Sequence, residues 1–171
     1  MNNFRELDVK DFICNPFEKI GSEWMLITAG TKENFNTMTA SWGSLGIMWG
    51  KNVCFTFIRP QRYTKEFIDN TSTFSLCFFD EDYKKILSYL GTVSGKDENK
   101  IEKSGFTPLF LDNTPCFEEA KLVLVCRKLY NQNILPDCFL DSSLAEKWYK
   151  QKDYHTMYIS EIEKIYIREN N

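Results

Sequence analysis

The sequence lacks the short motifs by which nucleotide-binding, metal-binding and hydrolytic proteins are usually detected. No G-x-G-x-x-G fingerprint and no P-loop occur, so neither a Rossmann nor a P-loop nucleotide site is predicted. The six cysteines are scattered and include no C-x-x-C pair, which argues against a zinc site and a disulfide framework. His155 is the only histidine and has no recognisable nucleophile setting, so a Ser-His-Asp triad is not credible.

Long apolar runs and an excess of positive charge are also missing. No apolar stretch approaches the ~20 residues that span a bilayer, and residues 1–14 are polar, without the apolar core of a secretion signal. The net charge of −3 argues against broad nucleic-acid binding, which needs a basic face. Cys54, Cys77 and Cys126 lie in apolar runs, where a reduced thiol acts as a small hydrophobe. We therefore expect a cytoplasmic protein with no metal site and no membrane or nucleic-acid partner.

The residues that are abundant favour one β-rich domain. Hydrophobic residues make up 43% of the chain, charged residues 26% and aromatic residues 15%, which suits a globular β core or a site that stacks on flat ligands. A chain of 171 residues fits a single domain over residues 1–171. Runs rich in β-branched and aromatic residues predict strands at Trp24–Ala29, Thr37–Trp42, Val53–Ile58, Thr73–Phe79, Lys121–Leu129 and Tyr154–Ile167. The apolar phase shifts within the last strand, which predicts a bulge there.

Helical patterns are short and lie between the strands. They predict helices at Thr64–Asp69, Glu81–Leu90 and Asp97–Lys103. Asp80 is expected to cap the second helix and Gly91 to end it in a left-handed conformation. Thr107–Phe117 is interpreted as an irregular connection, and Asn131–Asp153 as a polar loop with a short helix around Ser142–Trp148. The length of that loop indicates a functional or interface role. Many strands with short inserted helices predict a barrel or sandwich.

The stretch from Asn34 to Thr64 holds the densest polar chemistry. Its two predicted strands are separated by a segment with three glycines: Gly43, Gly46 and Gly50. The first strand is rich in hydroxyl and amide side chains, and two arginines and a threonine follow the second: Arg59, Arg62 and Thr64. One interpretation is an ordinary β-hairpin with a polar solvent face. The other is a bed for a flat, phosphorylated, redox-active ligand, because amides can bind a ring edge and arginines a phosphate.

The order N-x-M-T-x-S-W, then a strand, then R-P-x-x-x-T resembles the flavin reductase and flavoredoxin family, which binds FMN on a split β-barrel. The resemblance continues as G-T-V-S-G-K-D-x-x-K at Gly91–Lys100 and Y-H-T-M-Y-I-S-E-I at Tyr154–Ile162. Several blocks in the same order are more specific than any one of them. The resemblance implies a mainly β fold, an FMN-binding split β-barrel with short inserted helices, that forms a homodimer with the flavins near the interface.

The resemblance also implies roles for individual positions. In the family the first block lines the isoalloxazine, so the ring-side candidates are Asn36, Thr37, Met38, Thr39, Ser41 and Trp42. The candidates around the phosphate are Arg59, Arg62, Tyr63, Thr64, Ser94, Gly95, Lys96 and Lys100. Many relatives carry arginine where Lys96 stands, and lysine keeps the charge without the bidentate geometry. His155 is the catalytic candidate, as a contact to the ring or to nicotinamide, although a lone histidine is more often structural.

Three functions are consistent with these features. The first is a flavin reductase-like NAD(P)H:FMN oxidoreductase, which takes electrons from transiently bound NADH or NADPH, or from a protein donor, and passes them through FMN to an acceptor. Such hydride transfer needs stacking and orientation rather than a general base. The second is a non-enzymatic FMN-holding electron carrier or redox sensor for a redox partner protein. The third is a β-barrel binding module without flavin.

Overall fold

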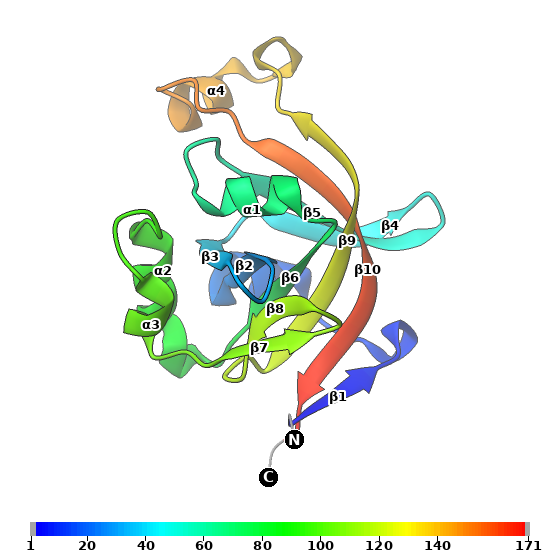
Figure 1. Cartoon of the computed structure of the whole chain (residues 1–171). Coiled ribbons are helices and arrows are strands. Elements are labelled where there is room, and N and C mark those ends of the chain that lie inside the picture. The colour runs from blue at the N-terminus through cyan, green and yellow to red at the C-terminus, as the bar shows by residue number, and fades with distance from the viewer. Residues whose placement is uncertain (1–2, 170–171) are drawn as a thin grey trace.

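The computed structural model describes residues 3–169, which form a strongly curled antiparallel sheet with short helices around it (Figure 1). The strands of this sheet are β1 (Phe4–Leu7), β2 (Met25–Gly30), β3 (Phe35–Ala40), β4 (Gly43–Met48), β5 (Lys51–Ile58), β6 (Thr73–Phe78), β9 (Leu122–Asn133) and β10 (Thr156–Arg168). They are ordered β3-β2-β6-β9-β10-β5-β4, and β1 pairs with β10. β3 and β4 stand at opposite ends of this order, yet only Ser41 and Trp42 separate them in sequence. The sheet must therefore curl until its edges approach, as in a barrel.

The remaining elements are short. The helices are α1 (Thr64–Asn70), α2 (Lys84–Thr92), α3 (Lys100–Ser104) and α4 (Ser142–Trp148). Single 3-10 turns form at η1 (Val9–Asp11), η3 (Glu81–Tyr83) and η4 (Pro136–Cys138), and η2 (Phe17–Glu23) is a short π-helix. β7 (Pro108–Leu111) and β8 (Thr114–Phe117) make a separate two-stranded sheet. In Figure 1, α2 and α3 lie together on one flank, and α4 lies beyond the far end of the β9–β10 pair. Within residues 3–169, none of the helices has the length and apolar character that crossing a membrane requires.

The curled sheet separates two apolar clusters. One fills the barrel interior and includes Ile27, Ile58 and Phe74, each with no exposed surface. The other lies between the sheet and the α2 and β7–β8 elements, where Phe79 stacks on Phe106 with ring centroids 4.8 Å apart. Successive side chains of a strand point to opposite faces, so β2 contributes to both clusters, and all its residues are buried. This explains the unbroken apolar run that predicts β2.

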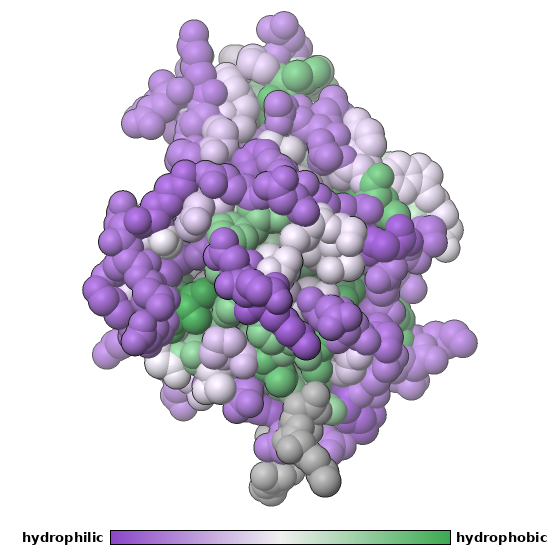
Figure 2. Space-filling model, viewed as in Figure 1, coloured by the Kyte–Doolittle hydropathy of each residue, from purple (hydrophilic) through white to green (hydrophobic). Residues whose placement is uncertain are grey.

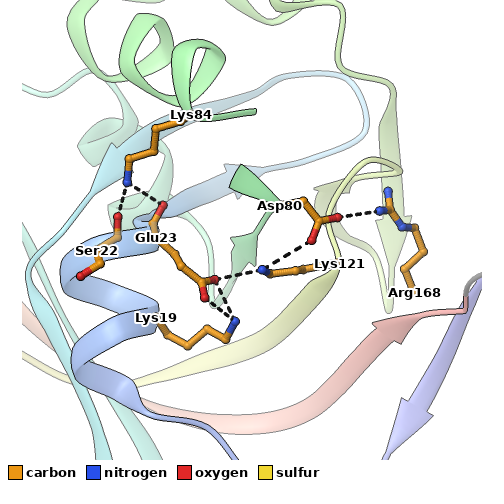
Figure 3. A network of polar contacts seen from close by, with 7 residues as sticks. All are labelled: Lys19, Ser22, Glu23, Asp80, Lys84, Lys121 and Arg168. Atoms are coloured by element: carbon orange, nitrogen blue, oxygen red, sulfur yellow. Dashed lines mark hydrogen bonds and ion pairs between the residues drawn. The ribbon is translucent and has the colours of Figure 1, made fainter. Parts of the chain in front are cut away.

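A network of ion pairs closes one end of the barrel (Figure 3). Glu23 at the end of η2 accepts from Lys19 at 2.8 Å and pairs with Lys121 at 3.1 Å. Asp80 pairs with Lys121 at 3.5 Å and with Arg168 at 3.1 Å. Lys84 at the start of α2 donates to the carbonyls of Ser22 and Glu23. The network therefore ties η2, α2 and the β9 and β10 strands together through alternating charges.

Most predicted strands and helices are confirmed within a few residues, including α4 over the predicted Ser142–Trp148. The predicted bulge in the last strand is also confirmed. β10 pairs with β5 on one side and with β9 on the other, and its register against β9 shifts between Ile159 and Ser160 and again between Ile162 and Lys164. These shifts let one long strand coil around the barrel.

One of the two interpretations of this stretch, an ordinary β-hairpin between the Thr37–Trp42 and Val53–Ile58 strands, is wrong. The glycine-containing segment between them forms a strand of its own, β4, which pairs with β5 through a tight turn at Trp49 and Gly50. Both turn residues have positive φ, of 53° and 69°, as a two-residue hairpin of this hand requires. β3 pairs with β2 instead. The region Thr107–Phe117, predicted to be irregular, contains the β7–β8 hairpin.

The predicted ends of the second helix are also wrong. α2 continues through Gly91 to Thr92, and Gly91 does not adopt a left-handed conformation. Gly91 instead lets the helix approach β3, since a Cβ there would lie 3.0 Å from the Cβ of Thr39. Asp80 precedes η3 in an extended conformation but makes no side-chain cap, because its carboxylate pairs with Lys121 and Arg168.

Candidate functional site

A cavity of ≈ 350 Å³ opens where β3, the β5–α1 connection and the α2–α3 connection meet. Its lining residues are Asn36, Met38, Arg59, Gln61, Arg62, Tyr63, Thr64, Thr92, Val93, Ser94, Gly95 and Lys100. We call it the cationic cavity, because three of these side chains are positively charged and none is acidic. It brings together segments that are far apart in the sequence.

Local chain geometry places the polar groups of the cavity. β3 turns the side chains of Asn36 and Met38 toward it, and Asn36 Nδ2 donates to Thr64 Oγ1 at 2.9 Å. Pro60 follows the end of β5, where it needs no ladder hydrogen bond, and the turn after it delivers Arg62. The α2–α3 connection passes so close to β3 that a Cβ on Gly95 would lie 2.5 Å from Asn36 Oδ1. Only glycine fits at that position without displacing Asn36.

Two cations of the cavity have backbone carbonyls, not carboxylates, as partners. Lys100 is only 4% exposed, and its Nζ donates to the carbonyls of Leu90 at 2.8 Å and Val93 at 3.0 Å. Arg62 Nη1 donates to the carbonyl of Gly91 at 2.6 Å. These carbonyls end α2, so the two side chains cap its C-terminus, whose dipole favours cations. That dipole offsets only part of two full charges.

The pKa values reflect this incomplete compensation. Burial, and next the positive charge of Arg62, lower the pKa of Lys100 to about 8. Burial and the charge of Arg59 also lower the pKa of Arg62. A cation whose pKa falls in this way is held in an environment that lacks negative charge. The cavity is therefore prepared electrostatically for an anion.

Arg59, the third cation, is held differently. Its Nη1 pairs with Asp153, and its Nη2 donates to the carbonyl of Trp148 at 2.9 Å. Its guanidinium carbon lies 5.2 Å from the centre of the Tyr149 ring. Asp153 also accepts from Gln61 Nε2 at 2.8 Å. The guanidinium of Arg59 thus joins the cationic cavity to the segment that contains α4.

A second, uncharged groove of ≈ 610 Å³ is lined in part by Tyr149, whose ring lies next to the guanidinium of Arg59. Its lining residues are Pro16, Phe17, Ile20, Gly21, Ser41, Trp42, Gly43, Ser44, Leu45, Phe57, Ile134 and Tyr149. We call it the uncharged groove. It receives the two residues that connect β3 to β4, so one continuous stretch of chain runs from the cationic cavity into this groove. Together the two spaces offer cations at one end and a neutral, aromatic lining at the other.

His155 lies beside the uncharged groove and is 8% exposed. Its Nδ1 is 2.8 Å from the hydroxyl of Tyr149, and its ring lies 5.0 Å from that of Trp42. Burial, and next the positive charge of Arg59, lower the pKa of His155 to about 4. The imidazole is therefore neutral at pH 7. It can orient a ligand but cannot serve as a proton donor in its charged form.

Three of the residues predicted to form the site lie elsewhere. The hydroxyl of Thr37 is buried against Thr28 Oγ1 at 2.8 Å, and that of Thr39 donates to the Leu87 carbonyl of α2. Both side chains point to the opposite face of β3 from Asn36, because neighbouring residues of a strand alternate. Lys96 is exposed and pairs with Glu66 over the ring of Tyr63. The other predicted residues line one of the two spaces, except His155, which lies beside them.

Sequence reasoning missed Gln61, Thr92, Val93, Tyr149 and Asp153. The first three lie within or beside the blocks R-P-x-x-x-T and G-T-V-S-G-K, so their positions could have indicated a role. Tyr149 and Asp153 belong to the long polar loop, whose length pointed to a function without indicating which residues carry it.

Comparison with known proteins gives a consistent result. A family model described as the flavin reductase like domain matches residues 17–171. None of the curated proteins compared with the chain matches it.

Solved structures show the same fold. Flavoredoxin from Methanosarcina acetivorans superposes with a TM-score of 0.65 at 23% identity, over 86% of this chain and 69% of that one. An FMN-binding domain of a flavin reductases-like enzyme from Shewanella baltica gives 0.68 at 14% identity, over 98% and 78%. An NADH:FAD oxidoreductase from Streptomyces globisporus gives 0.63 at 11% identity, over 84% and 74%. The predicted mainly β, split-barrel fold is thereby confirmed.

Proposed function

The chain belongs to the flavin reductase-like family, and on that premise we propose that it binds FMN and passes electrons from NADH, NADPH or a protein donor through the flavin to an acceptor. The observation that supports this most directly is the pair of buried cations, Arg62 and Lys100, whose hydrogen bonds go to backbone carbonyls. A phosphate would supply the negative charge that these side chains lack.

The residues present fit a phosphate and its attached chain. Thr64 and Ser94 add hydroxyl donors to the cations, and Gly95 leaves open the space that a Cβ would fill. From there, Asn36 and Met38 on β3 would contact the middle of the cofactor. The ring would enter the uncharged groove, where Ser41 and Trp42 offer a hydroxyl and an aromatic surface. Thr37 and Thr39 contribute to this site only by fixing β3 on the barrel and on α2.

FMN, when bound, supplies the chemistry of accepting a hydride and releasing electrons singly or in pairs. The contribution of this chain is to hold a donor against the flavin and to exclude other geometries. We propose that His155 contacts the ring or a nicotinamide as a neutral hydrogen-bonding group. Its hydrogen bond to Tyr149 and its packing on Trp42 would fix the plane of the imidazole.

We further propose that the protein works in the cytoplasm as a homodimer of single-domain chains. Large apolar side chains near the edge strand β4 support an interface there. Ile47 is 72% exposed and Trp49, at the tip of the β4–β5 turn, is 56% exposed. In Figure 2 an apolar patch lies beside this turn, on a mainly hydrophilic face that shows further apolar patches nearer its centre. Phe17 at the rim of the uncharged groove is 86% exposed, so a second chain there would also enclose the groove.

The visible spectrum of the purified protein, followed by titration with FMN, tests this function. We expect flavin bands in the protein as purified or a saturable change in the FMN spectrum on mixing. Oxidation of NADH or NADPH with added FMN then separates the enzyme from its alternative. Turnover supports the oxidoreductase, whereas tight FMN binding without turnover supports an electron carrier or redox sensor. A protein that stays colourless and leaves the FMN spectrum unchanged would contradict both.

A further inference from the structure

Residues 134–153 border the site, because Ile134 and Tyr149 line the uncharged groove and Asp153 pairs with Arg59, and we call these residues the strap. The strap leaves β9, forms η4 and α4, and returns to β10 (Figure 1). Its first residue, Ile134, donates its backbone N–H to the carbonyl of His155 at 2.9 Å. At its other end Trp148 packs edge-on against Trp42, with ring centroids 5.1 Å apart. Between these points η4 and α4 contain no buried residue. In the middle of the strap, the ring of Phe139 packs against those of Tyr149 and Tyr154 near the C-terminal end. The strap is therefore held mainly through contacts near its two ends.

We propose that Asp153 of the strap competes with a phosphomonoester for Arg59, and that binding of the phosphomonoester to Arg59 releases the strap. This inference rests on the proposed function only in assuming that the ligand of the cationic cavity carries a phosphate.

The hydrogen bonds at Asp153 carry the first part of the argument. A single carboxylate oxygen, Oδ2, accepts from both Arg59 and Gln61. Both donors line the cationic cavity, whereas Asp153 does not. The carboxylate thus draws two cavity donors toward the strap. Arg62 and Lys100, the other cations, make no such contact and keep their charges directed at the cavity.

The charges make the exchange favourable. A phosphomonoester carries about −1.5 to −2 charges at pH 7 and three acceptor oxygens, against one charge on a carboxylate. It would also interact with Arg62 and Lys100 at the same time, which Asp153 does not. The side chains of Arg59 and Asp153 are 23% and 16% exposed, so water can solvate the carboxylate once it is released. The more highly charged phosphomonoester can therefore compete with Asp153 for Arg59.

Transfer of the Arg59 guanidinium from Asp153 to a phosphate would weaken the attachment of the strap at its C-terminal end. Arg59 contributes the ion pair to Asp153, the hydrogen bond to the Trp148 carbonyl and the contact over the Tyr149 ring. Tyr149 also lines the uncharged groove. Binding of a phosphate in the cationic cavity would thereby change the position of Tyr149 in the uncharged groove, because the guanidinium of Arg59 contacts both.

The first test measures binding of inorganic phosphate, FMN and riboflavin to Asp153→Asn, with Asp137→Asn as the matched control. Asp137 lies in η4, is exposed, and carries the same charge on the same strap. We expect Asp153→Asn to bind phosphate and FMN on the order of three- to ten-fold more tightly, because a competing charge is removed. Riboflavin, which has no phosphate, should gain no affinity in Asp153→Asn, and Asp137→Asn should bind all three like the native protein. Unchanged or weaker phosphate binding by Asp153→Asn would show that Asp153 positions Arg59 and would overturn the proposal.

The second test follows amide hydrogen exchange in the strap of the native chain. With saturating inorganic phosphate, we expect faster exchange over residues 135–153, and in Asp153→Asn fast exchange already without phosphate. Slower exchange on adding phosphate, or none of these changes, would contradict the proposal. Because the probe is inorganic phosphate and not FMN, these tests can disprove the strap mechanism without disproving the proposed function, and the reverse also holds. A protein that passes both tests with phosphate but does not bind FMN would disprove the proposed function and leave the strap mechanism standing.

Discussion

Lys100 in the cationic cavity and Lys121 in the ion-pair network of Figure 3 show two uses of the same side chain. Lys121 lies between Glu23 and Asp80, at 3.1 and 3.5 Å. Burial is the largest single influence on the pKa of Lys121 and would lower it, but the hydrogen bond to Glu23 and the negative charges of Glu23 and Asp80 together outweigh burial, and the pKa is raised. Lys100 has only carbonyl partners, and its pKa is lowered to about 8. A lysine paired with carboxylates holds structural elements together, whereas the charge of a lysine with only carbonyl partners is available to an anionic ligand.

Replacing each lysine by methionine should separate the two uses most clearly. We expect Lys100→Met to bind FMN about 10- to 100-fold more weakly, corresponding to the loss of a charge-assisted hydrogen bond of about 1.5–3 kcal/mol. Lys121→Met should bind FMN like the native protein. Fluorescence titration measures both affinities, and thermal unfolding confirms that each variant is folded. Equal losses in the two variants would show that the position of the charge is unimportant.

Gly95→Ala sharpens the comparison by changing the shape of the cavity without changing its charge. The added Cβ would lie 2.5 Å from Asn36 Oδ1, whose amide group also donates to Thr64. We expect the free energy of unfolding to fall by about 1–3 kcal/mol, as is typical of overpacking, together with weaker FMN binding. Gly46→Ala is the control, since a Cβ there meets nothing within 4 Å. Urea unfolding measures both variants, and an unperturbed Gly95→Ala would mean that the loop is free to move away.

The pH dependence of binding should follow Lys100. Its pKa in the ligand-free protein is lowered to about 8, so above that pH the side chain loses its proton and its attraction for a phosphate. We expect the affinity for FMN to be nearly constant between about pH 7 and pH 8 and to fall above pH 8 by at most about tenfold per pH unit, whereas below about pH 6 protonation of the phosphate weakens binding separately. Lys100→Met should remove this part of the dependence.

The effect on stability has the opposite sign. Because the folded-state pKa of Lys100 lies below the ordinary value of 10.5, the protonated form opposes folding. That penalty is complete below pH 8 and fades as the pH rises toward 10.5.

The binding prediction is measured by isothermal titration calorimetry with FMN across pH 7–9.5. An affinity that stays constant over this range would exclude Lys100 from the ligand contact.

The smallest effect is expected for stability in the ion-pair network. Lys121→Met should lower the free energy of unfolding by about 0.2–1 kcal/mol, because the charges of Lys121, Glu23 and Asp80 are partly exposed to water. The difference should shrink in high salt, which screens such pairs. Lys150→Met, an exposed position outside the network, is the control. A loss that salt does not reduce would point to packing by the lysine stem.

The sequence was sufficient for most elements because their patterns are local. The unbroken apolar run of β2 and the phase shifts of β10 both correspond to observed features. β4 was missed because its two glycines and mixed burial give no alternating pattern. The face of β3 was also misjudged. Hydroxyls were expected to point at the ligand, but the Thr37 hydroxyl is buried against Thr28 on the face of the sheet outside the barrel interior, whereas Asn36 and Met38 line the cavity.

The cationic cavity was predicted in outline, and its electrostatics were not. Arg62 and Lys100 were identified through the resemblance, but their missing carboxylates can be seen only in three dimensions. The partner of Arg59 lies 94 residues away, so no local pattern could reveal Asp153. The long polar loop could be recognised as functional from its length, but the identity of the contacts depends on how the barrel closes.

The two-residue link between β3 and β4 has a wider consequence. Ser41 and Trp42 link β3 and β4, the two edge strands that the curling of the sheet brings together, and we call this link the seam. The same two residues form part of the wall of the uncharged groove. A molecule seated in that groove would contact both sides of the seam and act as a clasp. Local opening of the sheet between β3 and β4 would then require the molecule to dissociate. A bound ligand would therefore stabilise the sheet at the point where its two edges meet.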